Sequence, residues 1–172
     1  KLNSTFKLYH NNKFIDTINI NIPGKHNVLN ALAAISIALE LDIDISLIKK
    51  ALKNYSGVRR RFELKYEISN GIKIIDDYAH HPVEVQATIN AAKSGWNNRI
   101  ISIFQPHLFS RTRDFYKDFA KALNESDVVI VPDIYPAREK PIKNINSKLI
   151  INELINMGHN NSYYVPNPLS LP

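Results

Sequence analysis

Three loops of this sequence concentrate the side chains that can do chemistry. They are residues 76–82 (DDYAHHP), 105–113 (QPHLFSRTR) and 132–140 (PDIYPAREK), and each follows a short apolar run. Such runs are typical of strands in an open α/β sheet, where ligands bind beyond the carboxyl ends of the strands. Helices that follow these loops direct their N-terminal dipoles to the same edge. The sequence therefore predicts that charged groups crowd one edge of a sheet.

The first loop offers two carboxylates and two imidazoles. Asp76 and Asp77 could bind a ribose hydroxyl or a metal ion, and alternatively one of them caps the helix that Pro82 opens. His80 and His81 have no third ligand at metal spacing, which favours a hydrogen-bonded scaffold over a zinc site. We expect no metal site within this chain.

The second loop carries two arginines at the start of a helix. A guanidinium presents a fork that matches phosphate or carboxylate, so Arg111 and Arg113 are candidate ligand contacts. The alternative is a solvated helix face. A cation at a helix N-terminus is unfavourable because it opposes the helix dipole, and this favours a role for these arginines in binding an anionic ligand. In the third loop, residues 138–140 are interpreted as an exposed charged segment.

Two further groups lie nearer the N-terminus. His26, Asn27 and Asn30 begin a long apolar segment, and the two amides share a helix face because they are three residues apart. Amides on an apolar helix need partners. Capping of the helix explains Asn27 well and Asn30 poorly. Residues 59–61 (RRR) are the densest positive point, which suits a junction that holds one phosphate-facing arginine better than a nucleic-acid patch.

The elements that must position these groups fall into two parts. In the first part a β-hairpin is expected over 6–20, followed by a buried helix over 26–41 and an amphipathic helix over 44–54. The second part alternates strands and helices, which predicts an α/β fold with a mostly parallel sheet and helices on both faces. Its expected strands are 62–69, 72–75, 99–104, 128–131 and 162–165, the first two joined by a hairpin at Asn70-Gly71, and its helices are 82–94, 110–124 and 147–157.

Composition excludes several classes of protein. The 172 residues contain no cysteine, so a disulfide framework, a thiolate zinc site and a cysteine nucleophile are excluded. No apolar run reaches the roughly 18–20 residues of a membrane helix, and residues 1–30 lack the pattern of a signal peptide, so we expect a cytoplasmic protein that binds no membrane. The net charge of +6 fits an anionic partner. No glycine-rich phosphate loop is found, so an ATP cradle would have to lie upstream.

Five sequence blocks, in order, resemble the Mur ligases of peptidoglycan synthesis. The resemblance covers residues 1–160, and the blocks after residue 104 point to the alanine-adding branch of the family. They are residues 24–31 (GKHNVLNA), 57–63 (GVRRRFE), 76–82, 105–113 and 133–139 (DIYPARE).

The resemblance implies a piece of a three-domain, ATP-dependent carboxylate–amine ligase. Residues 1–57 would end the central ATP-binding domain, and residues 58–172 would belong to a Rossmann-like C-terminal domain. The implied reaction joins L-alanine to the carboxylate of UDP-N-acetylmuramate through an acyl phosphate, with ATP and Mg²⁺. Because the phosphate loop and the principal magnesium ligands would lie in the missing N-terminal and central domains of the same chain, we predict that residues 1–172 alone are inactive.

The resemblance also implies roles for individual residues. Leu108 and Phe109 depart from some relatives, which carry Arg and Tyr there, and this puts substrate contacts from those two positions in doubt. The implied roles are nucleotide contact for His26, Asn27 and Asn30, ribose contact for Asp77, a catalytic contact to the terminal phosphates for Arg61, and substrate contact for Tyr78, His80, Arg111 and Arg113.

Two other functions stay open. A sister ligase that attaches a murein peptide to the same sugar looks similar around residues 76–82 and differs in the block that begins at Gln105. A basic α/β module that binds nucleic acid predicts Lys and Arg spread along one face. In this sequence the notable arginines lie in loops at strand ends instead, so we expect no nucleic-acid partner.

Overall fold

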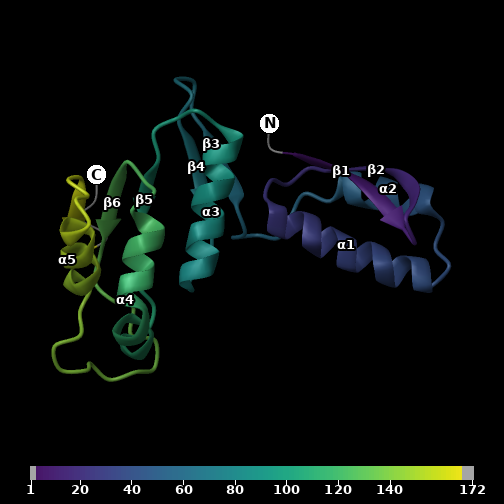
Figure 1. Cartoon of the computed structure of the whole chain (residues 1–172). Helices are drawn as coiled ribbons and strands as arrows, with labels where there is room; N and C mark the ends of the chain where they lie inside the picture. Colours follow the sequence, from purple (N-terminus) through teal and green to yellow (C-terminus); the bar gives the residue numbers. More distant parts are fainter. Residues whose placement is uncertain (1–2, 168–172) are drawn as a thin grey trace. The chain divides into compact units, whose positions relative to one another are not determined.

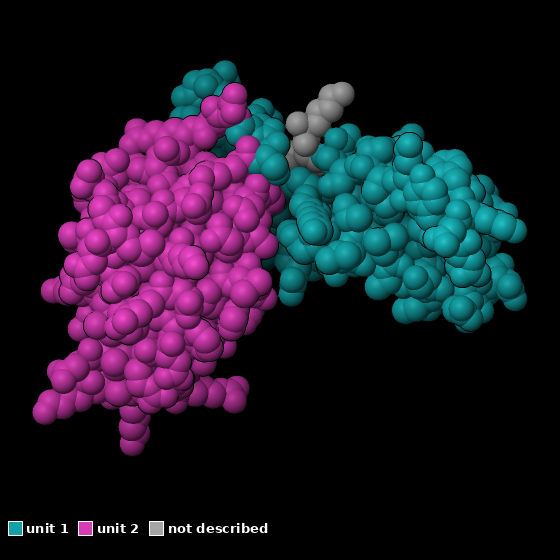
Figure 2. All heavy atoms as spheres, viewed as in Figure 1, with its two compact units in different colours: residues 1–78, 94–96 teal, residues 79–93, 97–172 magenta. Residues whose placement is uncertain are grey.

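The structure, a computed structural model, describes residues 3–167. These residues divide into two compact units (Figure 2). Unit 1 contains the chain up to Tyr78 together with Ser94–Trp96, and unit 2 contains Ala79–Lys93 and the chain from Asn97 onward. The division between residues 1–57 and 58–172 expected from the resemblance stays a prediction.

Unit 1 begins with an antiparallel hairpin of β1 (Ser4–His10) and β2 (Lys13–Ile20). Asn11 and Asn12 form its turn with φ of +48° and +60°. A tight hairpin turn requires positive φ at both central residues, and Asn tolerates that conformation better than most residues. The predicted hairpin is confirmed.

Helices α1 (Lys25–Glu40) and α2 (Ile45–Asn54) pack with this hairpin (Figure 1). Asp44 caps α2 by accepting the N–H of Ser46 at 2.8 Å, which satisfies one orphan donor of the first turn. The core that they share contains the buried side chains Leu8, Ile18, Ile20, Ala31, Ile35 and Ile48.

The burial expected for α1 is wrong on one side of the helix. Ala31 and Ile35 face the core, but Leu29 and Ile37 are 57% and 64% exposed. An apolar helix buries only the face that meets another element, and within unit 1 nothing covers the face of Leu29 and Ile37.

A second hairpin of unit 1 consists of β3 (Glu63–Glu67) and β4 (Lys73–Asp76), which pair antiparallel. Gly71, with φ of +86°, allows the tight turn between them and donates its N–H to the Ile68 carbonyl at 2.8 Å. Within the described residues β4 pairs with β3 alone. The expectation that residues 76–82 follow a strand of the parallel sheet is therefore wrong, because β4 and β3 form a two-stranded sheet of their own.

Unit 2 is built on a parallel sheet in the order β5-β6-β7, with β5 at Ile101–Ile103, β6 at Val128–Val131 and β7 at Ser162–Tyr164. The connections between them are α4 (Phe109–Leu123) and α5 (Lys148–Asn156), while α3 (Pro82–Gly95) precedes β5 (Figure 1). Alternation of strands and helices produces parallel pairing, because each crossover helix returns the chain to the end of the sheet where the previous strand began, and the next strand then runs in the same direction. The predicted α/β class is confirmed.

The described helices bury one face of this sheet. Val129 and Val131 point to that face and have no exposed surface, and they share a core with Phe119 of α4 and Leu154 of α5. On the opposite face, Ile103 of β5 is 60% exposed, and Tyr163, which lies two strands away on β7, is 52% exposed. The expectation of helices on both faces is thus met on one face by residues 3–167. In the same range, every helix is too short or too polar to cross a membrane.

Candidate functional site

In unit 2 the loops after β5 and β6 are joined by backbone hydrogen bonds. Tyr135 donates its N–H to the Pro106 carbonyl at 2.8 Å, and Leu108 donates to the Tyr135 carbonyl at 3.0 Å. The side-chain amide of Gln105 also donates to the Asp133 carbonyl at 3.2 Å. Two of the three predicted loops therefore do meet at one sheet edge, and they form a single framework.

Three rings and one guanidinium lie together on this framework, and we call them the ring cluster: His80, His107, Tyr135 and Arg111. The His107 ring stacks on Tyr135 at a centroid distance of 5.6 Å and meets the ring of His80 edge-on at 6.3 Å. Arg111 Nη1 lies 3.3 Å from His107 Nδ1. Since a guanidinium only donates, Nδ1 accepts this hydrogen bond and Nε2 carries the imidazole proton.

The surroundings of His107 keep its imidazole neutral. Burial is the main cause that lowers the pKa of His107, and the positive charge of Arg111 and the nearby His80 lower it further. Glu139 acts in the opposite direction. The cluster therefore presents one permanent cation, Arg111, beside an uncharged ring.

Glu139 holds the first turn of α4. The N-cap residue Leu108 has φ of +74° and provides no side-chain cap. Glu139 supplies the missing acceptor, because its carboxylate accepts the Ser110 N–H at 2.9 Å and also the Ser110 hydroxyl. These hydrogen bonds lower the pKa of the Glu139 carboxyl below its usual range. A carboxylate at this place is also favoured by the helix dipole.

Arg113 is not brought into the ring cluster. Its Nε donates to Asp114 Oδ1 at 2.7 Å, and its Nη2 donates to Asp114 Oδ2 at 3.1 Å. Arg113 is exposed, whereas Arg111 is half-buried. Of the two arginines that the sequence singled out, the structure places Arg111 alone among the rings.

His80 has a partner within its own loop. Its Nδ1 lies 3.5 Å from Glu84 Oε2, and the same carboxylate accepts the backbone N–H groups of His80 and His81 at 3.0 and 3.1 Å. This is the hydrogen-bonded scaffold that the sequence favoured over a zinc site. Residues 3–167 contain no group of three potential His, Asp or Glu metal ligands.

In unit 1 the arginine run forms a tight turn that is held by the segment after β4. Arg60 and Phe62 have φ of +58° and +48°. Asp77 Oδ2 accepts the Phe62 N–H at 2.8 Å, and Tyr78 donates its N–H to the Arg60 carbonyl at 2.7 Å. The Arg60 guanidinium lies over the Tyr78 ring at 4.9 Å and pairs with Asp76 at 3.6 Å. Asp77 and Tyr78 thus join the turn that carries Arg61.

Arg61 differs from its neighbour Arg60. It is exposed, and within the described residues its guanidinium makes no hydrogen bond or ion pair. Its backbone is fixed, because the Arg61 N–H donates to the Val58 carbonyl at 3.1 Å. The turn therefore commits Arg60 to protein contacts and leaves Arg61 available to an anion.

The first turn of α1 holds the remaining predicted residues. Gly24 has φ of +103°, and a Cβ added there would lie 2.7 Å from His26 Cε1, so the glycine lets the imidazole sit against the backbone. Asn27 donates from Nδ2 to the Pro23 carbonyl at 2.7 Å. Asn30 is exposed, and in the part of the chain that the structure describes its side chain makes no hydrogen bond. The capping predicted for Asn27 is therefore wrong, because Gly24 is the N-cap of α1, no side chain caps the helix, and Asn27 donates to a carbonyl instead of accepting an N–H. Within the described residues, Asn27 is engaged with the protein and Asn30 has no side-chain partner.

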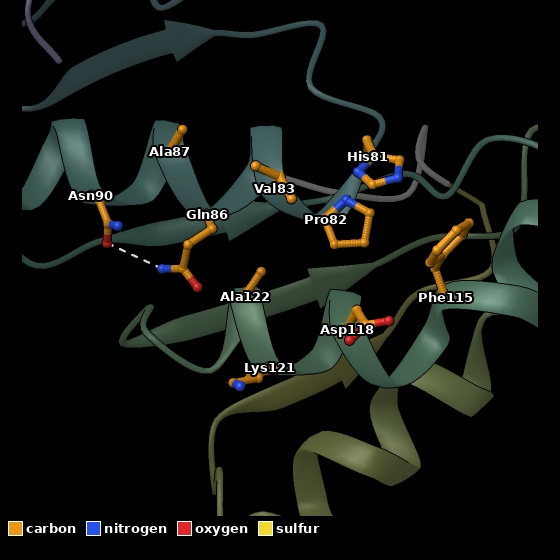
Figure 3. A pocket seen from close by; sticks show the side chains of 10 residues that line it. All are labelled: His81, Pro82, Val83, Gln86, Ala87, Asn90, Phe115, Asp118, Lys121 and Ala122. Carbon is orange, nitrogen blue, oxygen red and sulfur yellow. Dashed lines mark hydrogen bonds between the residues drawn. The ribbon is translucent and has the colours of Figure 1, made fainter. Parts of the chain in front are cut away.

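A groove of about 530 Å³ lies elsewhere in unit 2, between α3 and α4 (Figure 3). Gln86 and Asn90 of α3 line one side and hydrogen-bond each other at 3.1 Å, while Asp118 and Lys121 line the other. Its polar side chains do not converge on one point, and none of the predicted site residues lines it.

The sequence reasoning missed the parts played by His107, Tyr135 and Glu139. All three lie in loops that it had marked as chemically interesting. Their contacts join residues about 30 positions apart, as in the hydrogen bonds between Ser110 and Glu139. One signal was available in the sequence. Residues that follow two neighbouring parallel strands by the same number of positions become neighbours in space.

Comparison with known families and proteins matches most of the chain. Residues 60–169 match the family model "Mur ligase, glutamate ligase domain". A UDP-N-acetylmuramate–L-alanine ligase from Geobacter sp. (strain M21) is 46% identical over 156 residues, which are 90% of this chain and 34% of that protein. The ligase of the same name from Pelodictyon phaeoclathratiforme is 56% identical over 126 residues, 73% of this chain and 26% of that protein.

Solved structures give the same picture. A UDP-N-acetylmuramate-alanine ligase from Thermotoga maritima superposes with a TM-score of 0.77 at 34% identity, covering 91% of this chain and 33% of that one. A murein peptide ligase from Psychrobacter arcticus has a TM-score of 0.62 at 25% identity, covering 95% of this chain and 34% of that one. The chain spans about a third of the length of these relatives.

Proposed function

The chain belongs to the Mur ligase family, and from that membership we propose that the protein containing it is an ATP-dependent carboxylate–amine ligase. Its substrates would be UDP-N-acetylmuramate and L-alanine, in the synthesis of the peptidoglycan precursor. The observation that carries this choice is the identity of 46% over 90% of the chain to a relative of that name. The higher structural similarity to the alanine ligase than to the murein peptide ligase supports it.

The proposed reaction proceeds in two steps. A carboxylate is a poor electrophile, so the muramoyl carboxylate first accepts the terminal phosphoryl group of ATP and becomes an acyl phosphate, with release of ADP. The uncharged amine of alanine then attacks the acyl carbon, phosphate leaves with its bonding electrons, and the amine loses a proton. Catalysis of such a transfer consists mainly of positioning and charge stabilisation.

In this proposal unit 1 supplies contacts to the nucleotide. Arg61 is the catalytic residue, because an unpaired guanidinium can stabilise charge that grows on the transferring phosphoryl group. Asn30 and His26 would contact the nucleotide, with Asn27 through its remaining amide oxygen. Asp77 would bind the ribose through the carboxylate that also holds the Phe62 N–H.

In unit 2 the ring cluster would receive the sugar–alanine end of the reaction. Arg111 suits an anionic group of UDP-N-acetylmuramate, and His80 would contact the same substrate. For Tyr78, which belongs to unit 1, a substrate contact is proposed from the sequence resemblance alone. Arg113, engaged with Asp114, would have to exchange that partner before it could contribute.

These residues fit a nucleotide and do not by themselves fit its metal ion. The exposed guanidinium of Arg61 and the free amide of Asn30 suit phosphate and base or sugar contacts. Mg²⁺ prefers carboxylates in octahedral geometry, and residues 3–167 hold no group of three potential ligands. We therefore propose that the principal magnesium ligands and the phosphate loop lie in a central domain outside residues 1–172. When bound, the ion would neutralise phosphate charge.

The test uses the longest open reading frame that contains these residues. Phosphate release is measured with ATP, Mg²⁺ and UDP-N-acetylmuramate, with and without L-alanine. Release that requires both the sugar nucleotide and alanine is the expected result. Release with a murein peptide in place of alanine would identify the sister ligase. A folded protein with an intact phosphate loop that releases no phosphate with either acceptor would overturn the proposal.

A further inference from the structure

The first turn of α4 is held in place by the loop that follows β6. Backbone hydrogen bonds tie Leu108 and Pro106 to Tyr135, and Glu139 accepts both the N–H and the hydroxyl of Ser110. These contacts lie immediately on either side of His107 and next to Arg111 in the sequence. The conformation of that segment is therefore set by a loop that lies about 30 residues further along the chain.

The turn needs this support because it is locally unfavourable. Leu108 has φ of +74°, a conformation that is rare for a bulky residue and costs of the order of a kcal/mol or more if nothing compensates it. The same residue caps α4 and has no side-chain acceptor for the orphan N–H groups of the first turn. Glu139 compensates the missing cap, because its carboxylate supplies the acceptor and a negative charge at the positive end of the helix dipole. The strained residue itself is held by the hydrogen bond from the Leu108 N–H to the Tyr135 carbonyl.

Glu139 also occupies the place where a helix would otherwise offer backbone donors to an anion. The N-termini of helices after parallel strands are ready-made anion sites. In α4 the Ser110 N–H and hydroxyl both bind the Glu139 carboxylate. An anionic substrate group arriving at this edge would meet the side chain of Arg111 in place of these donors.

We propose that Glu139 is a positioning residue, which orients the Arg111–His107 pair toward an anionic group of UDP-N-acetylmuramate by fixing the first turn of α4. This inference rests on the proposed ligase function, in which Arg111 contacts UDP-N-acetylmuramate. Glu139 touches neither substrate nor nucleotide in this scheme. Its effect should therefore fall on the substrate that Arg111 binds and should spare ATP.

The kinetic test compares Glu139→Ala and Glu139→Gln with a matched control in the full-length protein. Glu125→Ala is the control, because Glu125 is also a unit 2 carboxylate and is engaged by Lys93 at 2.5 Å away from the ring cluster. We expect Glu139→Ala to raise the KM for UDP-N-acetylmuramate about tenfold, equivalent to about 1.4 kcal/mol of binding, with the KM for ATP within about twofold of wild type. Glu139→Gln should recover part of this, since its amide oxygen can still accept the Ser110 N–H. Glu125→Ala should leave both KM values unchanged.

A second readout does not depend on activity. The NMR resonances of the His107 ring are followed against pH in the same variants. Glu139 raises the pKa of His107, while burial, Arg111 and His80 lower it, and Glu84 faces His80. Removing the carboxylate should therefore lower the pKa of His107 further in Glu139→Ala and Glu139→Gln, and Glu125→Ala should leave it at the wild-type value.

The two proposals fail in different ways. If the wild-type protein releases no phosphate with alanine or peptide, the ligase function fails, and the His107 titration alone then decides whether Glu139 governs the ring cluster. If the wild-type protein is active but Glu139→Ala lowers the Tm while both KM values and the His107 titration stay at wild type, Glu139 is only a helix cap and the positioning role is refuted.

Discussion

Substitution of Arg61 should abolish most of the activity without unfolding the protein. The argument uses the contrast between two adjacent arginines in one turn. Arg60 pairs with Asp76 at 3.6 Å and covers the Tyr78 ring at 4.9 Å. Arg61 is exposed and, in residues 3–167, has no side-chain partner. The two substitutions Arg61→Ala and Arg60→Ala remove the same atoms and the same charge from neighbouring positions.

The expected magnitudes follow from these contacts. Loss of one donor to developing charge in a transition state typically lowers kcat by about 10²–10³, or about 2.7–4 kcal/mol. An exposed side chain without partners contributes less than about 0.5 kcal/mol to stability, so Arg61→Ala should leave the Tm unchanged. For Arg60, a solvent-exposed ion pair contributes about 0.2–1 kcal/mol, and an exposed cation–π contact about 0.5–1 kcal/mol. Arg60→Ala should thus lower stability by about 1 kcal/mol.

The assay measures kcat, KM for ATP and Tm for wild type, Arg61→Ala, Arg61→Lys and Arg60→Ala in the full-length protein. Arg61→Lys keeps the charge but loses the planar fork, so it should recover part of the lost rate. A kcat for Arg61→Ala within threefold of wild type would refute the catalytic role. So would an equal loss in Arg60→Ala at an unchanged Tm, because the effect would then reflect general positive charge.

Three further outcomes are expected. Gly24→Ala should lower the Tm and raise the KM for ATP. The added Cβ would lie 2.7 Å from the His26 ring, and positive φ costs an L-residue about 1–2 kcal/mol. The Tm and the KM for ATP of this variant should be compared with those of wild type in the full-length protein. In urea denaturation, Phe119→Ala should lose about 3–5 kcal/mol of unfolding free energy, since Phe119 is 1% exposed, while Ile103→Ala, at a 60% exposed position, should stay within about 0.5 kcal/mol. Because the folded protein holds the pKa of Glu139 below its ordinary value of 4.5, wild type should exceed Glu139→Gln in Tm above pH 4.5, and the difference should vanish as the pH falls through the lowered folded-state pKa.

The elements themselves were largely predictable because their signals are local. Asn11-Asn12 and Asn70-Gly71 mark turns that require positive φ, and the structure has hairpins at both. Pro82 begins a helix, as its fixed φ and missing N–H favour. Each of these signals depends on residues within a few positions of one another, so the sequence contains the whole cause.

What the sequence could not reveal depends on distant partners. The apolar periodicity of α1 cannot say which of its sides meets a neighbour, and Ile37 proved to be exposed. The hairpin signal at Asn70-Gly71 does not say whether β4 also joins the parallel sheet, and only the structure shows that, among the described residues, β4 pairs with β3 alone. The role of Glu139 at α4 arises from a fold that brings it to Ser110, and nothing near Glu139 in the sequence indicates it.

The arginines of α4 show how the structure changes the reason for expecting a ligand. A cation at a helix N-terminus seemed to require an anion because it opposes the dipole. In the structure, the carboxylate of Glu139 lies at the positive end of the helix dipole, and Asp114 pairs with Arg113. Arg111 is different, because it is half-buried and its recorded partner is the imidazole of His107, which burial keeps neutral. A neutral acceptor satisfies a guanidinium's geometry but leaves its charge uncompensated, and within residues 3–167 no carboxylate pairs with Arg111. A partly desolvated charge without a counter-ion is costly, so at α4 the expectation of an anionic ligand now rests on Arg111 and no longer on the helix dipole.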